Sequence, residues 1–125
     1  MVLAALALGL AGIVATFLPQ EVLSALGVAT PGPLPLLVQL EGALLFGFAM
    51  LNWLAKDTLL GGIYGRAVTV GNLAHFVCGG LALLKTAATG GAPVLWLLTV
   101  VYVGFALWFA LVLFTTPQVP LPATR

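Results

Sequence analysis

Four long apolar stretches alternate along the chain with short segments that hold most of the prolines and charges. A bilayer core of about 30 Å needs about 20 apolar residues in one helix, and each stretch approaches that length. The pattern therefore predicts four membrane-crossing helices, over residues 2–18, 34–55, 62–84 and 93–114.

Helix-breaking residues mark where the predicted helices begin and end. Pro19 closes the first helix and the prolines of residues 31–35 open the second, because proline removes a donor and clashes with the preceding turn. Between them, residues 20–26 predict a short interfacial helix with Gly27 as its C-terminal stop. Its apolar side chains, which we expect to face lipid, are Val22, Leu23 and Leu26.

Two further turns and a tail complete the predicted organisation. Residues 56–62 predict the turn between the second and third helices, and residues 86–93 the turn between the third and fourth. Residues 115–125, with three prolines, predict a flexible tail. We expect the first helix to be retained rather than cleaved as a signal peptide, since no Lys or Arg precedes its long apolar run.

Composition supports the membrane interpretation and excludes other classes of protein. Of 125 residues, 62% are hydrophobic and 6% charged, and the mean hydropathy is +1.24, whereas soluble domains carry about 25% charged residues. Four basic residues build no phosphate-binding patch, so nucleic-acid binding is excluded. The predicted fold is all-α, an integral membrane antiparallel four-helix bundle forming one domain over residues 1–125.

The few charges indicate an orientation. Lys56, Arg66 and Arg125 fall on one side of the predicted bundle and Lys85 on the other, and cytoplasmic loops are rich in basic residues. Both termini are therefore expected in the cytoplasm. Lys56 and Arg66 are expected to reach lipid headgroups.

Polar side chains inside the predicted helices are costly and mark candidate sites. Residues equally far from a turn centred near residue 59 lie at the same depth, which places Asn52 level with Arg66 and Glu41 nearly level with His75. Arg66 is then expected to pair with Asn52 or with the turn residue Asp57. Tyr102 of the fourth helix reaches the level of His75.

Three interpretations of this polar layer stay open, and in the last of them Glu41 and His75 make no contact at all. In the first, Glu41 and His75 share a proton or bind a ligand, because a carboxylate and an imidazole in low dielectric shift each other's pKa. Asn72, one turn before His75, then orients the ring or the ligand, and the Tyr102 hydroxyl pairs with Glu41 or His75. In the second, Glu41 and His75 form an interhelical hydrogen bond that fixes the register of the second and third helices.

No catalytic set, metal site or cofactor is predicted. Cys78 follows His75 by three residues, but two ligands on one helix do not complete a tetrahedral zinc site. Motifs of nucleophilic catalysis and phosphate binding are missing from the sequence.

Small residues predict where the helices approach closely. The second helix carries Ala43 and Gly47 at a spacing of four, and the third carries Ala67, Gly71 and Gly79 along one line. The first helix has its own set of small residues at the depth of His75: Gly9, Ala11 and Gly12. Either the first helix packs tightly there, or the missing side chains leave a cavity beside the polar layer.

Three segments carry a resemblance to a known family: the exit of the first helix over residues 16–27, the segment 41–57, and the pair Gly71 and Asn72. Their order resembles small bacterial four-helix membrane proteins and is loosely similar to the DoxX-like family. The resemblance implies four helices and a bacterial inner membrane, and it implies no activity. Members often carry an Arg near the position of Glu41, so the polar pair does not transfer from the family.

Three functions are compatible with these features. The leading hypothesis is a small interaction protein that contacts lipids and other transmembrane helices, as an accessory subunit of a larger complex or as a homo-oligomer. The second is transport or binding of a lipophilic or protonatable molecule, such as a quinone, at Glu41, Asn72, His75 and Tyr102. The third is an intramembrane enzyme with His75 as general base and Glu41 as its partner.

Overall fold

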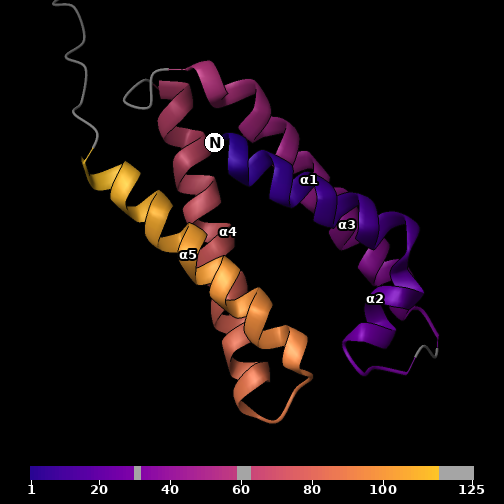
Figure 1. Ribbon diagram of the computed structural model, residues 1–125. Coiled ribbons are helices and arrows are strands. Elements are labelled where there is room, and N and C mark those ends of the chain that lie inside the picture. The colour runs from indigo at the N-terminus through magenta and orange to yellow at the C-terminus, as the bar shows by residue number, and fades with distance from the viewer. Residues whose placement is uncertain (30–31, 59–62, 116–125) are drawn as a thin grey trace, which may run out of the picture.

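All the regular secondary structure of the described residues is helical (Figure 1). The computed structural model describes residues 1–29, 32–58 and 63–115. These ranges contain five α-helices and one 3-10 turn, and no strand. The elements are α1 (Val2–Phe17), α2 (Pro19–Ala25), α3 (Leu34–Leu54), η1 (Ala55–Asp57), α4 (Ile63–Ala88) and α5 (Pro93–Thr115). The predicted all-α class is confirmed, while the predicted tail beyond Thr115 lies outside the described residues.

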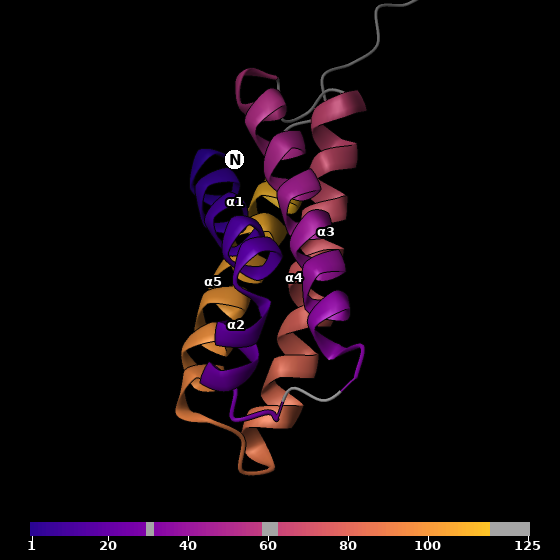
Figure 2. The same ribbon diagram turned by 90° about the vertical axis from the view of Figure 1, so that its right-hand side faces the viewer.

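The long helices pair into two hairpins. Helix α1 packs along α3, and α4 packs along α5, whereas α3 and α4 touch over a short stretch only. The hairpins diverge as a V from the end at which α3 leads into α4 (Figure 1). The view turned by 90° shows all four long helices running along the length of the molecule, so the splay lies in the plane of Figure 1 (Figure 2).

Three helical segments are long and apolar enough to cross a membrane. They are α3 with its 3-10 extension (Leu34–Asp57), Tyr64–Ala88 of α4, and α5. Helix α1 has 16 residues, so it spans about 24 Å, which is less than a bilayer core. It passes the same test only together with α2, as a pair of helices bent by 104°.

The bend between α1 and α2 follows from Pro19, which begins α2 and has no N–H to donate back into α1. The Gln39 amide of α3 donates to the free Thr16 carbonyl at the end of α1, over 3.2 Å. Gly27, with a φ of 72°, ends the short helix as expected. Leu23 was expected to face lipid, but this prediction is wrong because its side chain is buried within the protein.

Helix α4 is one turn longer than the sequence suggested. It runs to Ala88, and the Thr86 hydroxyl donates to the Ala82 carbonyl within this added turn. Gly90, with a φ of 94°, then reverses the chain before α5. A glycine, rather than the polar residue Thr86, therefore sets the end of the helix.

Helices α1 and α3 approach most closely at two glycines. A Cβ atom on Gly12 would lie 2.8 Å from the Gly42 carbonyl oxygen, and one on Gly42 would lie 2.8 Å from the Gly12 carbonyl oxygen. The two backbones are thus in direct contact, as small residues allow. The expected Ala43 and Gly47 lie on the exposed side of α3, where a Cβ on Gly47 would meet nothing within 4 Å.

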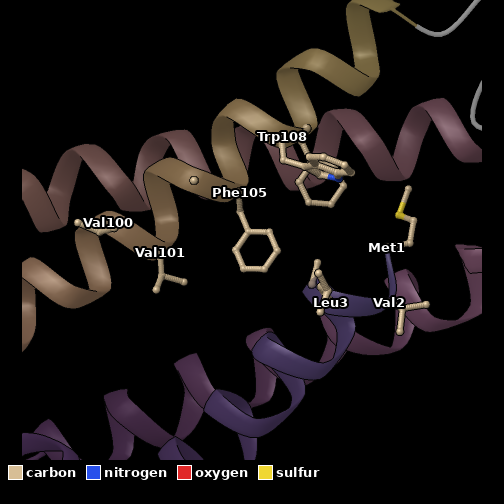
Figure 3. Close-up of a pocket in the computed structure, with 10 residues that line it drawn as sticks. Met1, Val2, Leu3, Val100, Val101, Phe105 and Trp108 are labelled. Carbon is tan, nitrogen blue, oxygen red and sulfur yellow. The ribbon is translucent and has the colours of Figure 1, made fainter.

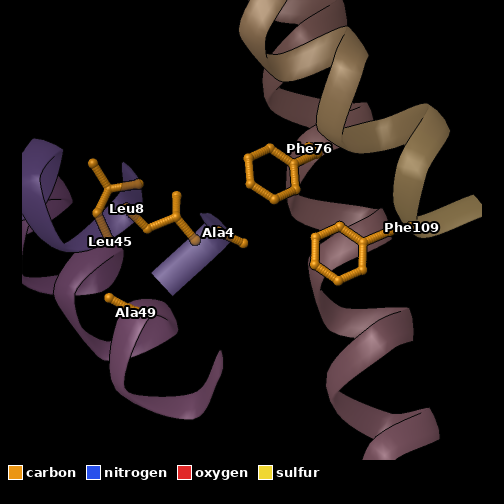
Figure 4. Packing of buried hydrophobic residues seen from close by; sticks show 6 residues of the cluster. All are labelled: Ala4, Leu8, Leu45, Ala49, Phe76 and Phe109. Carbon is orange, nitrogen blue, oxygen red and sulfur yellow. The ribbon is translucent and has the colours of Figure 1, made fainter. Parts of the chain in front are cut away.

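A small apolar cluster contains side chains of both hairpins (Figure 4). Phe76 and Phe109 are each 1% exposed, and their rings stack with centroids 5.8 Å apart. The complete cluster consists of Ala4, Leu8, Leu45, Ala49, Phe76 and Phe109. All four long helices contribute to it, so it holds the two hairpins at their angle.

Candidate functional site

Two asparagines form the polar contact between α3 and α4. Asn52 donates to the Asn72 oxygen over 2.7 Å, and Asn72 donates to the Asn52 oxygen over 3.2 Å. Each amide also donates to the carbonyl four residues earlier, at Phe48 and Val68. Both side chains are fully buried, and all four amide hydrogens are used. Asn72 is therefore occupied with Asn52 and does not orient the His75 ring.

This pair shows that the depth matching predicted from the sequence was wrong. Asn52 meets Asn72, six residues further along α4 than the expected Arg66. The 3-10 turn η1 prolongs α3 to Asp57, which moves the centre of the connection to later residues. The same offset places Phe48 rather than Glu41 opposite His75.

His75 lies among aromatic rings. Its ring stacks on Phe48 with centroids 4.9 Å apart, and it touches Phe76 edge-on at 5.2 Å. The Tyr102 hydroxyl lies 3.4 Å from Nε2 of His75, at the long limit of a hydrogen bond. The other ring nitrogen, Nδ1, has no hydrogen-bond partner among the described residues, so His75 keeps one polar atom for a further interaction.

Glu41 shares a face of α3 with the residues that meet α4. Positions 41, 45, 48 and 52 follow one another at helical spacing, and Phe48 and Asn52 both contact α4. Glu41 is nevertheless exposed, so no other helix of the described chain covers it. It forms no hydrogen bond or ion pair with His75 or Tyr102 in the described structure. A base held by an orienting acid is thus not assembled here.

Gly79 positions the tyrosine of this site. A Cβ atom at Gly79 would lie 2.6 Å from Cε1 of Tyr102, so the ring rests directly on the helix backbone. A Cβ on Gly71 would make an ordinary contact of 3.8 Å with Phe48, and Ala67 is exposed. Of the three small residues predicted on this helix, Gly79 is the one that permits a close approach.

The basic residues near the connection have separate environments. Lys56 lies 3.4 Å from the Asp57 carboxylate and 4.5 Å from the centroid of the Trp53 ring. Because Asp57 pairs with Lys56 and Asn52 pairs with Asn72, neither of the partners expected for Arg66 is bound to it. Arg66 is exposed and forms no hydrogen bond or ion pair within the ranges that the structure describes.

A cavity of about 510 Å³ lies between the first turn of α1 and the middle of α5 (Figure 3). Phe105 lines this cavity and also stacks on Phe76, which touches His75, with the centroids of the two phenylalanine rings 4.8 Å apart. The side chains around it are apolar apart from the indole of Trp108. The cavity therefore adjoins the layer of His75 and Tyr102 without including either residue.

The described part of the chain holds no group of three His, Cys, Asp or Glu residues that could bind a metal ion. Cys78 is a free, exposed cysteine. The arrangement around His75, with Nδ1 unpaired, suits hydrogen bonding to a ligand or to a neighbouring helix.

Comparisons with protein families, curated proteins and solved structures find no match to this chain. Similarity to the DoxX-like family therefore stays a prediction.

Four residues were predicted from the sequence to form the site: Asn72, His75, Tyr102 and Glu41. Of these, the structure brings His75 and Tyr102 into contact. The prediction missed Phe48 and Phe76, which surround His75 on two sides. The signal for Phe48 was present, since it lies between Glu41 and Asn52 on one helical face. The signal for Phe76 was weak, because a phenylalanine in an apolar helix is ordinary.

Proposed function

We propose that this chain is an integral membrane protein that works by assembling with other transmembrane helices, as an accessory subunit or as a homo-oligomer. In this proposal α1 with α2 supplies a fourth crossing, and both termini lie in the cytoplasm of a bacterial inner membrane. The charge bias around Lys56 and Arg66 and the resemblance to DoxX-like proteins support that placement.

The observation that carries the proposal is the exposure of Glu41 within the apolar span of α3. It lies seven residues into the helix, about 10 Å from its end, on the face that α4 leaves uncovered. An ionised side chain at the centre of a membrane helix costs about 2.5–3.5 kcal/mol or more, and Glu41, nearer to the end of α3, bears part of that cost. A partner helix that donates a hydrogen bond or a positive charge to Glu41 removes this cost.

Photo-crosslinking from two neighbouring positions tests the proposal. Benzoylphenylalanine is placed at Leu37 in one variant and at Leu36 in the other, so that Glu41 itself stays in place, and both are irradiated in native membranes. Leu37 lies one turn before Glu41 on the same face of α3, whereas Leu36 is equally exposed but points about 100° away from Leu37 around the helix. We expect a protein adduct of one defined mass from position 37 and none from position 36. Lipid adducts alone, or the same protein adducts from both positions, would contradict the proposal.

A second candidate function is the binding of a lipophilic small molecule, and the cavity beside α5 favours it. Its volume of about 510 Å³ falls within the range of about 300–1,000 Å³ typical of ligand pockets. His75 offers one unpaired ring nitrogen in the adjoining layer, with Tyr102 beside it. Mass spectrometry of small molecules that co-purify with the chain tests this function.

A further inference from the structure

The lining of the cavity between α1 and α5 has a distinctive chemistry (Figure 3). One wall presents aromatic rings of α5, Phe105, Trp108 and Phe109, and the opposite wall is the first turn of α1. The remaining lining residues of α5 are Val100, Val101 and Gly104. The Met1 side chain also lines the cavity, and methionine adapts readily to the shape of a ligand.

Trp108 supplies the one side-chain hydrogen-bond donor of the lining. Its indole N–H has no hydrogen-bond partner among the described residues, and an indole nitrogen donates but does not accept. The backbone N–H groups of the first turn of α1, at Val2, Leu3 and Ala4, likewise lack intrahelical acceptors. The lining therefore offers donors and no side-chain acceptor.

This chemistry selects a narrow class of occupant. A ligand with its own N–H or O–H would leave that donor unpaired in an apolar cavity, which is unfavourable. A cationic ligand would lose its hydration without gaining a countercharge, because the one charged group among the lining residues, the α-amino group of Met1, is itself positive. A flat ring fits against the aromatic wall of Phe105 and Phe109.

We propose that the cavity binds a planar aromatic carbonyl compound, whose oxygen accepts a hydrogen bond from the Trp108 indole. This inference rests on the second candidate function, ligand binding, and it moves the ligand from the His75 layer to the α5 cavity. It stands independently of the partner helix proposed at Glu41.

Tryptophan fluorescence reports binding directly, because an aromatic carbonyl compound quenches a nearby indole. One reporter variant carries Trp53→Phe and Trp96→Phe, so that only Trp108 emits. The matched reporter carries Trp53→Phe and Trp108→Phe and retains Trp96, which lies on the same helix outside the cavity. Both are titrated with 1,4-naphthoquinone in detergent micelles. We expect saturable quenching of Trp108 and a linear, unsaturable response from Trp96.

Two glycines provide the control for the location of the site. A Cβ on Gly104 or on Gly47 would meet nothing within 4 Å, so a side chain can start from either position without a clash. Gly104 lines the cavity and Gly47 does not. In the Trp108 reporter, Gly104→Leu is expected to weaken saturable quenching by about tenfold or more, while Gly47→Leu leaves it unchanged.

Three results would overturn the inference. The first is a linear response from both reporters, and the second is saturable quenching that Gly104→Leu does not alter. The third is a phospholipid that co-purifies with the wild-type chain and is lost in Gly104→Leu, which would assign the cavity to an acyl chain. Quenching that is lost in Tyr102→Phe but kept in Gly104→Leu would place the ligand at the His75 layer, so the second candidate function would survive while this site would not.

Discussion

Asn52 and Asn72 bind each other through two hydrogen bonds, and each also donates a hydrogen bond to a backbone carbonyl of its own helix. Every amide hydrogen of the pair is satisfied, which a side chain in a hydrocarbon environment requires. The pair also lies where α3 and α4 are still in contact, before the hairpins diverge. It therefore fixes both the register and the closed end of the V.

Replacing one asparagine should destabilise the protein by more than the loss of its own hydrogen bonds. Asn52→Leu or Asn72→Leu leaves the remaining amide buried with a lost partner, and we expect a loss of about 1–3 kcal/mol in the free energy of unfolding. The double variant removes both polar groups, so it should recover part of that loss. Denaturant titration in detergent micelles measures the three values. Strictly additive losses would show that the two amides are not coupled.

The crossing of α1 and α3 depends on the absence of a side chain at Gly12. Gly12→Ala places a Cβ against the Gly42 carbonyl, so the helices must separate, and we expect a loss of about 1–3 kcal/mol in stability. Gly47→Ala is the matched control, because its Cβ enters open space on α3. Thermal unfolding in detergent compares the two variants. Equal melting temperatures for both would refute the close crossing.

The contact between His75 and Tyr102 depends on Gly79. Gly79→Ala pushes the Tyr102 ring away, because the new Cβ overlaps Cε1, and we expect the His75 ring signals to shift in NMR spectra. Gly80→Ala on the same helix adds a Cβ at an ordinary 3.6 Å from Tyr102 and should leave these signals in place. Tyr102→Phe removes the hydroxyl alone and should reproduce the part of the shift that the hydrogen bond causes. Identical spectra for Gly79→Ala and the wild type would rule out the contact.

The sequence predicted the helices well because prolines and glycines mark their ends. Pro19, Pro93 and Gly27 lie where the structure places a helix boundary or a stop. The end of α4 was misplaced by one turn, since Thr86 continues the helix by donating to a carbonyl within it. Local chemistry was thus sufficient for the elements.

The arrangement of the helices was harder to predict because it depends on offsets between them. A symmetrical turn would place Glu41 opposite His75, but η1 shifts the partner of His75 to Phe48. The same offset leaves Glu41 on an uncovered face and pairs two asparagines that the sequence had not joined. Small residues misled for a similar reason, since spacing identifies Gly47 as readily as Gly42 but only the latter lies at a crossing.

Native mass spectrometry of the wild-type chain and Glu41→Leu, each released from the membrane in a mild detergent, shows whether Glu41 holds the chain in a complex. We expect the wild type to leave the membrane as a complex heavier than its own 12.9 kDa, in a fixed stoichiometry with itself or another subunit. Glu41→Leu should abolish the complex, while Glu41→Gln, which keeps a hydrogen-bonding side chain, should retain it at least in part. A wild-type chain detected as a monomer, or a complex that Glu41→Leu leaves intact, would contradict the role assigned to Glu41.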